Sequence, residues 1–496
     1  MRNAHAVAQV RAAESELMAL LPEGALMQRA AAGLASACAS LLGAVYGSRV
    51  VVLAGSGDNG GDALYAGARL AARGARVTAI AAGSRVHQGG TTALRGAGGR
   101  LLEAADRGVD AAITGAELII DGLLGIGGRG GLREPAASLA AAAQRARGRV
   151  VAVDLPSGID ADTGEAAGAA VQADVTITFG TWKPGLLIDP GASHAGVAEL
   201  VDIGLAPYLG RPDAAAPQAA DIAAWLPRPS AESDKYRRGV LGILAGSDRF
   251  TGAPTLSVGG AIRGGAGMVR LVSAEHAAAV VREHWPEALI TVIDPARTGA
   301  EMIDDAGRVQ AWAAGPGMGT GEDAARLLGA VLATSLPVLV DADGITLLAA
   351  HRGLLARDAP TLLTPHAGEL ARLLGADRAD VEAHRLRFVT QAAAELGCTV
   401  LLKGSTTVIA SPDADREVLV NPTGTSWLAT AGSGDVLTGL AGSLLAQGLE
   451  PQHAAVTAAY LHGIAARLAA EGAPIGASDI IGSLAAATRT VTQTPG

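Results

Sequence analysis

The stretch RVVVLAGSGDNGGDAL, residues 49–64, decides how the first half of the chain is interpreted. Its β-branched apolar run predicts a buried strand, and the glycine-rich segment that follows predicts a tight turn into a helix. By spacing alone, Gly55, Gly57 and Gly60 match G-x-G-x-x-G, the pattern of dinucleotide-binding turns. That pattern also needs an acidic residue at the end of the next strand, to bind the ribose. Here that strand ends in AIAAGS, without an acid, so a Rossmann dehydrogenase is not indicated.

Length and composition exclude several classes of protein. A chain of 496 residues corresponds to two or three domains, and 49% hydrophobic with 18% charged residues is typical of a soluble globular protein. The net charge of −9, without a basic run, indicates neither a nucleic-acid partner nor an anionic membrane. Cys38 and Cys398 are the only cysteines, which gives no disulfide framework and no metal cluster. With no signal peptide or membrane span recognised, we expect a cytoplasmic protein.

The order of the apolar runs predicts two α/β domains. Residues 5–45 are predicted to be helical, and short strand-like runs then alternate with Ala-rich helical segments, which indicates a parallel, doubly wound sheet covered on both faces. Residues 205–230 are rich in Pro and Ala and are interpreted as a linker, with the domain boundary at residue 218. A different α/β series and a long helical region follow. We therefore expect one domain over 1–218 and another over 219–496.

Polar residues follow the predicted strands of the first domain. In open parallel sheets, ligands bind beyond the carboxyl ends of the strands, so these residues are candidates for a site. They are Asp58, Asn59, Asp62, Asp121, Asp154, Ser157, Asp160 and Lys183. For Asp160 or Asp162 alone, capping of a helix is the simpler explanation. Lys183, Lys235 and Lys403 are the only lysines of an Arg-rich chain, which favours positions that need a compact ammonium group.

Four motifs in order resemble the N-terminal domain of the NAD(P)H-hydrate epimerases: GSGDNGGDAL, DGLLGIGG, VDLPSGIDADTG and TFGTWKPG. The resemblance covers residues 1–215 and implies a Rossmann-like fold. It implies a potassium ion held by Asn59, Asp121 and Ser157, and Asp154 as the acid/base group beside the hydrated nicotinamide. It further implies substrate-binding loops made of Asp58, Asn59, Gly60, Gly61, Asp62, Gly125, Ile126, Gly127, Gly128, Arg129, Gly130 and Gly131.

Two residues depart from the epimerase pattern. Asp58 stands where that family usually has Asn, and Ala63 where it usually has Gly. A carboxylate in a phosphate-binding loop lowers the affinity for anions unless it faces a cation. A first domain that binds without catalysing is therefore an alternative.

A second glycine turn precedes a long apolar helix. NPTGTSWLATAGSGDVLTGL, residues 421–440, places Gly432, Gly434 and Asp435 at the helix start, where free N–H groups and the helix dipole can bind an anion. Asp435 could accept the proton of a hydroxyl that attacks a terminal phosphate. A plain helix cap is the alternative. DADG, residues 341–344, is rejected as a calcium loop because Arg352 stands where that loop needs Glu.

Residues 222–490 resemble the ADP- or ATP-dependent NAD(P)H-hydrate dehydratases of the ribokinase-like superfamily. The segments that carry this resemblance include SDKYRRGVLGILAGS, AGPGMG, VLVDADGITLL, TPHAGELARLLG and LLKGSTTVIAS. By resemblance, the hydrated dinucleotide would be bound by Ala253, Gly317, His366 and Asp435. The adenine nucleotide would be bound, with magnesium, by Lys403, Gly404, Ser405, Thr406, Thr407 and Gly434. Asp234 replaces a usual His, which leaves the role of that segment open.

Together the two resemblances imply a repair enzyme for hydrated NADH and NADPH. The first domain would interconvert the R and S hydrates, and the second would dehydrate the S form while ADP is converted to AMP and phosphate. We expect a homo-oligomer. The alternative is a ribokinase-like small-molecule kinase with a non-catalytic N-terminal domain. The sequence does not distinguish ADP from ATP, or the hydrate of NADH from that of NADPH.

Overall fold

The computed structural model describes residues 1–83, 85–230, 232 and 234–493. The chain forms two compact units. The first is Arg2–Ala214, and the second is the part from Ala215 onward together with Met1. Both units are α/β, as predicted, and each is described by itself below.

The first unit is built on a parallel sheet with the strand order β4-β3-β2-β5-β6-β7-β8. Its strands are β2 Arg49–Ala54, β3 Arg76–Ala81, β4 Arg100–Glu103, β5 Leu118–Gly122, β6 Arg149–Val153, β7 Val175–Phe179 and β8 Val197–Val201. The β-branched runs RVVVLAG, ARVTAIAAG, AELIIDGLLG, RVVAVDLPSG, ADVTITFG and HAGVAELVDIG predict all of these strands except β4, which is short and only partly buried. The order reverses between β2 and β5, and such a switch point opens a crevice at the carboxyl ends of the strands.

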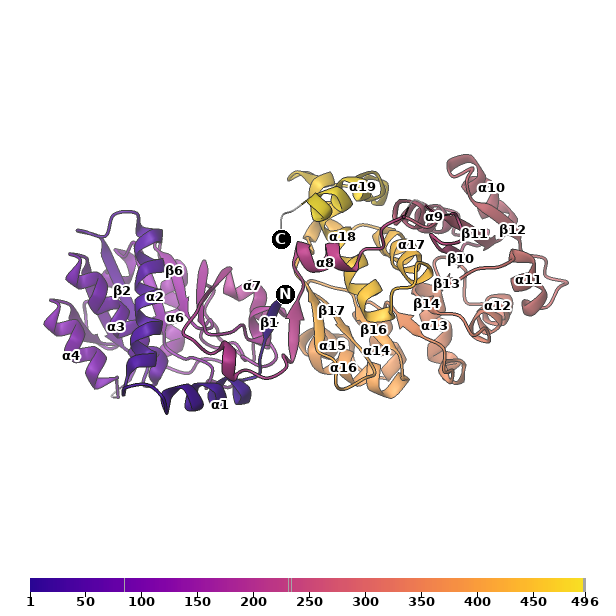
Figure 1. The fold of residues 1–496 in the computed structure, drawn as a ribbon. Coiled ribbons are helices and arrows are strands. Elements are labelled where there is room, and N and C mark those ends of the chain that lie inside the picture. Colours follow the sequence, from indigo (N-terminus) through magenta and orange to yellow (C-terminus); the bar gives the residue numbers. More distant parts are fainter. Residues whose placement is uncertain (84, 231, 233, 494–496) are drawn as a thin grey trace. The chain divides into compact units, whose positions relative to one another are not determined.

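Helices cover both faces of this sheet (Figure 1). Because alternate residues of a strand point to opposite faces, Val50 and Val52 of β2 pack into one apolar cluster and Val51 and Leu53 into the other. α2 Ala25–Leu42 and α3 Asp58–Ala72 belong to the first cluster, and α4 Gln88–Gly96 adds Leu94 to it. The second cluster includes α5 Val109–Thr114 and α6 Ala136–Arg145. The unit also contains α7 Gly191–Ala195 and the 3-10 turn η1 Pro184–Leu186.

The N-terminal segment is largely helical, as predicted for residues 5–45, but it forms two helices with a break between them. It consists of β1 Arg2–Ala4, α1 Val7–Met18 and α2, with Gly24 in the left-handed conformation (φ 75°) directly before α2. A proline at 22 and a glycine at 24 break the periodicity there. α2 is long and apolar enough to cross a membrane by length and composition alone. It nevertheless packs as an amphipathic core helix, and Arg29 donates a hydrogen bond to the carbonyl of Ile203.

The second unit contains a sheet whose order runs β18-β17-β16-β15-β14-β13-β10-β11-β12. The strands are β10 Val240–Leu244, β11 Met268–Ser273, β12 Leu289–Val292, β13 Ala311–Ala314, β14 Val338–Val340, β15 Thr361–Leu363, β16 Thr399–Leu402, β17 Thr407–Ala410 and β18 Val418–Asn421. β17 runs antiparallel to both β16 and β18, and the other pairs are parallel. All nine strands were predicted from their apolar runs.

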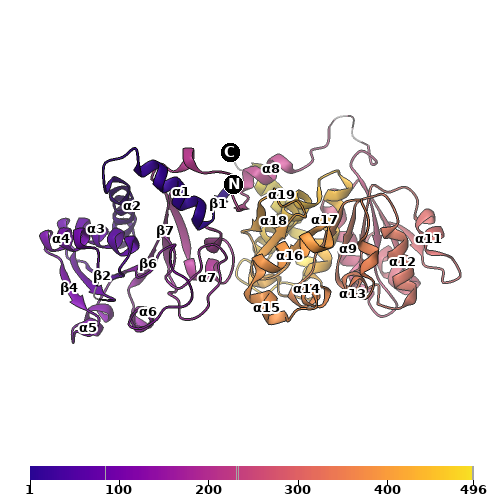
Figure 2. The same cartoon turned by 90° about the horizontal axis from the view of Figure 1, so that it is seen from below.

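Two layers of helices cover the second sheet (Figure 2). One apolar cluster joins β10 to α8 Ala219–Trp225, α9 Gly252–Arg263, α17 Ser433–Ala446, α18 Pro451–Ala470 and α19 Ala477–Gln493. The other layer includes α12 Glu322–Leu332, α13 Ala342–Ala350, α14 Ala367–Leu374 and α16 Arg385–Leu396. The remaining elements are α10 Glu275–His284, α11 Gly299–Ala306, α15 Arg378–Ala383, η3 Arg352–Leu355 and η4 Ser426–Leu428.

The division between the two units, after Ala214, falls inside residues 205–230, where a linker was predicted, but this segment is not irregular. This segment contains η2 Ala206–Tyr208, β9 Ala214–Ala216 and α8, and all three residues of β9 are buried. β9 joins the sheet of the second unit beyond β18. Three consecutive alanines show no alternation of polar and apolar residues, so periodicity could not reveal this strand.

Candidate active sites

A cavity of about 660 Å³ lies at the carboxyl ends of the strands of the first sheet. This volume is within the usual range for small-molecule and cofactor sites. Of the predicted residues, the cavity is lined by Asp58, Asn59, Asp62, Gly125, Ile126, Gly127, Gly128 and Asp154. The structure therefore brings together the first glycine turn, the loop after β5 and the end of β6.

Other predicted loop residues have packing roles in the structure. Gly60 and Gly61 are buried inside α3, and a Cβ on Gly60 would lie 2.3 Å from the carbonyl oxygen of Gly55. Gly131 packs against Gly168, and Gly130 has a positive φ of 74°. Arg129 lines a smaller cavity of about 70 Å³ that adjoins the same loop. Gly60, Gly61, Gly130 and Gly131 thus shape the walls without lining the main cavity.

Asp154 is held in an unusual conformation at the cavity wall. Its φ is 64°, which is rare for a residue other than glycine, and such strain persists where the surroundings fix it. Its Oδ1 accepts hydrogen bonds from Thr178 Oγ1 (3.0 Å) and the Phe179 N–H (3.1 Å), and forms an ion pair with the Lys183 ammonium group. Lys183 is buried. The side chain is therefore placed to act on a ligand in the cavity.

Asn59 and Ser157 contact the carbonyl oxygen of Leu124, and Ser157 also contacts Asp121. Ser157 Oγ and Asn59 Nδ2 lie 3.0 Å from the Leu124 oxygen, and Ser157 Oγ donates to Asp121 Oδ1 at 2.7 Å. The carboxylate, hydroxyl and carbonyl oxygens gathered here are of the type that a hard cation prefers, whereas Asn59 turns its amide nitrogen toward them. Within the described parts of the chain, no group of three His, Cys, Asp or Glu forms a metal cluster. Burial raises the pKa of Asp121 to about 6, although hydrogen bonds from Ser157 and Leu123 oppose the shift.

Two helices contribute cavity residues that the sequence analysis did not single out. Arg11 and Glu14 of α1, and Met27 of α2, line the main cavity. Burial raises the pKa of Glu14, and the negative charge of Asp154 raises it further. In the sequence, these residues stand out only as part of amphipathic helices. Such a pattern shows that one face of a helix is covered, but not whether that face lines a cavity or packs into the core.

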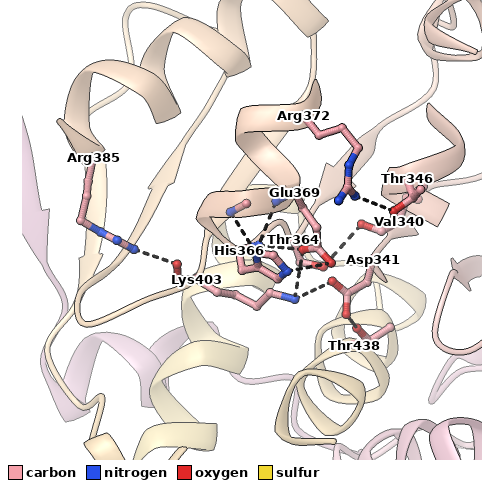
Figure 3. A network of polar contacts seen from close by, with 11 residues as sticks. Val340, Asp341, Thr346, Thr364, His366, Glu369, Arg372, Arg385, Lys403 and Thr438 are labelled. Carbon is pink, nitrogen blue, oxygen red and sulfur yellow. Dashed lines mark hydrogen bonds and ion pairs between the residues drawn. The ribbon is translucent and has the colours of Figure 1, made fainter. Parts of the chain in front are cut away.

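A second polar site surrounds Asp341, at the end of β14 (Figure 3). The Asp341 carboxylate is buried and accepts hydrogen bonds from Lys403 Nζ (2.6 Å) and Thr438 Oγ1 (2.7 Å). Glu369 lies 4.0 Å from the same ammonium group. These partners raise the pKa of Lys403 against the opposing effect of burial. The network joins β14, the end of β16, α14 and α17, and the sequence analysis missed Asp341, Glu369 and Thr438.

Asp435 lies in the first turn of α17, beside this network. A Cβ on Gly434 would be 3.5 Å from Lys403 Nζ, and Gly432 begins the turn with a φ of 87°. Burial raises the pKa of Asp435 to about 7, with a further contribution from the negative charge of Asp341, whereas Lys403 lowers it. A carboxyl group with such a pKa is suited to accept a proton near neutral pH. The predicted glycine turn and Lys403 therefore lie at one site.

The other residues predicted for the second unit are a pair of neighbouring small residues, a helix cap and the segment 404–407. A Cβ on Gly317 would lie 3.0 Å from the Cβ of Ala253, so these two residues are neighbours. His366 caps α14 and accepts hydrogen bonds from the N–H groups of Gly368 and Glu369. Ser405 is exposed, Thr406 is buried, and Thr407 begins β17. Gly404 packs tightly against Arg385.

Asp234, the residue that replaces a usual His, is exposed and stabilises a turn. It accepts hydrogen bonds from the N–H groups of Tyr236 (2.8 Å) and Arg237 (2.9 Å). These bonds lower its pKa.

The chain is a two-domain α/β protein that has a cavity at the strand ends of its first unit and a glycine turn at the start of a long helix in its second. Residues 23–185 match the family model described as YjeF-related protein N-terminus, and residues 241–482 match the NAD(P)H-hydrate dehydratase model. Over 461 residues, the chain is 47% identical to the bifunctional NAD(P)H-hydrate repair enzyme Nnr of Mycobacterium tuberculosis, covering 92% of this chain and 91% of that protein. The chain therefore belongs to the bifunctional NAD(P)H-hydrate repair enzymes.

Solved structures also resemble the second unit. A ribokinase-like superfamily protein from Enterococcus faecalis has a TM-score of 0.51 and 23% identity, over 58% of this chain and 99% of that one, and it shares the fold. The ADP/ATP-dependent NAD(P)H-hydrate dehydratase of Bacillus subtilis, co-crystallised with ATP/Mg²⁺, has a TM-score of 0.48 and 30% identity, over 55% of this chain and 97% of that one.

Proposed function

We propose that this chain repairs hydrated NADH and NADPH in two steps. Residues 1–218 interconvert the R and S hydrates, and residues 219–496 convert the S hydrate to the reduced dinucleotide while ADP becomes AMP and phosphate. The observation that carries this proposal is that each unit presents one reactive carboxyl group beside glycine-rich backbone, Asp154 in the first and Asp435 in the second.

In the first unit, Asp154 removes the proton of the 6-hydroxyl group of the hydrate. The C6–O bond becomes a carbonyl, the C6–N1 bond breaks, and its electron pair moves to N1 and the conjugated carboxamide. Rotation about the adjoining C5–C6 bond presents the other face of the carbonyl to N1. When the ring closes, N1 attacks C6, and the proton returns from Asp154 to the oxygen. The loops around Asp58 and Gly125 bind the phosphates through backbone N–H groups.

Asn59, Asp121, Ser157 and the Leu124 carbonyl would hold a potassium ion in this unit. When bound, the ion supplies positive charge near the substrate. The same residues also fix the loop after β5, because Leu124 N–H donates to Ser157 Oγ at 2.8 Å.

In the second unit, the oxygen of the 6-hydroxyl group attacks the terminal phosphorus of ADP, and Asp435 accepts the proton that this hydroxyl group loses. The bond from that phosphorus to the bridging oxygen breaks and AMP leaves. The phosphorylated hydrate then loses phosphate, driven by the N1 electron pair, and loss of the C5 proton gives the dinucleotide. Residues 403–407 and Gly434 bind the nucleotide, and magnesium would screen the phosphate charge.

The test supplies purified R or S hydrate to the protein with ADP, ATP or no nucleotide, and follows absorbance at 340 nm. We expect nucleotide-dependent recovery from both epimers, and ADP preferred to ATP. Asp154→Asn should block recovery from the R hydrate alone, and Asp435→Asn recovery from both. Accumulation of a stable phosphorylated product, without recovery, would instead identify a small-molecule kinase.

A further inference from the structure

The hydrogen bonds of Lys183 are fully used at the cavity wall of the first unit. Its ammonium group has three donors. They reach Asp154 Oδ1, Thr178 Oγ1 (3.0 Å) and the carbonyl oxygen of Phe179 (3.1 Å), and 1% of the side chain is exposed. A buried ammonium group whose donors are all paired is held in one position.

All the contacts that hold the Asp154 carboxylate converge on one of its two oxygens. Lys183, Thr178 and the Phe179 N–H each donate to Oδ1. Among the described residues, no hydrogen bond is found to Oδ2. Since Asp154 lines the cavity, Oδ2 is the oxygen left for a ligand.

The cavity is rich in carboxyl groups. Besides Asp154, it is lined by Glu14 of α1 and by Asp58 and Asp62 of α3, and Arg11 of α1 also faces it. Burial and the charge of Asp154 raise the pKa values of Asp62 and Glu14, and Asp62 Oδ1 is buried without a hydrogen-bond partner. Of these four carboxyl groups, Asp154 is the one that forms an ion pair with the buried Lys183 ammonium group, which distinguishes it from the other three.

We propose that Lys183, assisted by Thr178, is a positioning residue of the epimerase site: it anchors Oδ1 of Asp154 and thereby turns Oδ2 toward the 6-hydroxyl group of the hydrate. This inference rests on the proposed function of the first unit. Lys183 does not itself exchange a proton. Thr178 links the two charged groups, because its hydroxyl accepts from Lys183 and donates to Asp154.

The experiment measures kcat and KM for R-to-S conversion by the full chain at neutral pH, with the epimers separated by chromatography. Lys183→Met keeps the length of the side chain but removes the ammonium group. We expect its kcat to fall about 100-fold with little change in KM, because Asp154 is no longer held in position while the loops that bind the substrate are intact. Thr178→Val, which keeps the ammonium group, should lose about tenfold in kcat.

A double variant tests whether Lys183 acts through Asp154. In the Asp154→Asn background, Lys183→Met should cause no further loss of rate, because the residue that it positions is already inactive. An additional loss of the same size as in the wild type would overturn the proposal, and so would a loss in Lys183→Met that appears in KM while kcat is unchanged. Thermal unfolding shows whether Lys183→Met is folded. If it is not, Thr178→Val tests the same contact with a smaller change.

Failure of the proposed function gives a different result. If the first unit is not an epimerase, the wild-type chain itself does not accelerate conversion of the R hydrate. If only the role of Lys183 is wrong, the wild-type chain is active and Lys183→Met behaves like it.

Discussion

Asp154 and Asp435, the two proposed proton acceptors, have different surroundings. Asp154 lies beside a buried ammonium group and two further hydrogen-bond donors. Asp435 lies in a mostly buried turn near a second carboxylate, which raises its pKa to about 7. The same residue type therefore meets opposite electrostatic environments in the two units, and these follow from neighbours far away in sequence.

The pKa of Asp435 predicts the pH dependence of dehydration. Only the ionised carboxyl group can accept a proton, so kcat/KM for the S hydrate should fall about tenfold per pH unit below about pH 7 and level off above it. Asp435→Asn should abolish the activity. A flat profile between pH 5 and 8 with the wild-type chain would contradict the assignment of Asp435 as the base.

The same shift affects stability. Because the folded-state pKa of Asp435 lies above its ordinary value of 3.8, the folded chain holds this proton more tightly than the unfolded chain. Its contribution to stability is complete below about pH 4 and is lost as the pH rises through about 7. At pH 8, Asp435→Asn should therefore unfold at a higher temperature than the wild-type chain, and this difference should vanish near pH 4. A difference independent of pH would contradict the shift.

We expect replacement of Asp58 to change the affinity of the first unit for its substrate. It is exposed in the first turn of α3 and lines the cavity. Replacing it with Asn removes a negative charge near the expected phosphates, so KM for the hydrate in epimerisation should fall about fivefold, or ~1 kcal/mol, with little change in kcat. Asp110→Asn is the matched control, since Asp110 is an exposed first-turn aspartate of α5 outside the cavity. An equal effect of both changes would indicate net charge alone.

At the scale of elements, Asp341 ties the active turn of the second unit to its sheet. Its carboxylate bonds to Lys403 at the end of β16 and to Thr438 of α17. These elements are separated by tens of residues in sequence, and each contributes one partner. The start of α17 is therefore positioned by a buried polar network as well as by apolar packing.

Removing this carboxylate should damage the second site selectively. Asp341→Ala leaves the Lys403 ammonium group without its close partner, at a cost of about 3–5 kcal/mol in the free energy of unfolding of that unit. We expect dehydration to be lost and R-to-S conversion to be retained, as measured by chromatography. Thr438→Val removes one hydrogen bond and no charge, so its cost should be about 1 kcal/mol. Parallel loss of both activities would show that the effect is not confined to the second unit.

At the scale of the whole molecule, two sites in one chain make a test of complementation possible. The Asp154→Asn variant should retain only the dehydratase activity, and the Asp435→Asn variant should retain only the epimerase activity. The S hydrate released by one protein can diffuse to the other, so an equimolar mixture should recover NAD(P)H from the R hydrate although neither variant does so alone. Recovery is measured at 340 nm with ADP. No recovery in the mixture, with each remaining activity intact, would mean that the intermediate does not leave the chain.

The sequence by itself indicated all but the shortest or least patterned strands, and the strand ends at which polar residues gather. Buried strands carry continuous β-branched runs, and glycine turns followed by polar residues mark the start of helices, so both signals are local. The sequence also indicated Asp154, Asp435 and the set around Asp121. It did not indicate β9, whose three alanines have no pattern, or the break between α1 and α2.

Only the tertiary structure decided which groups share a site. The pairing of Lys183 with Asp154, the network of Lys403, Asp341 and Glu369, and the place of Glu14 in the cavity each join residues that are distant in sequence. Burial and neighbouring charge shift the pKa values of Lys403 and Glu14, and neither cause can be read from spacing along the chain. The motifs therefore indicated where polar residues gather in each unit, whereas the folded arrangement determines which charged groups are partners.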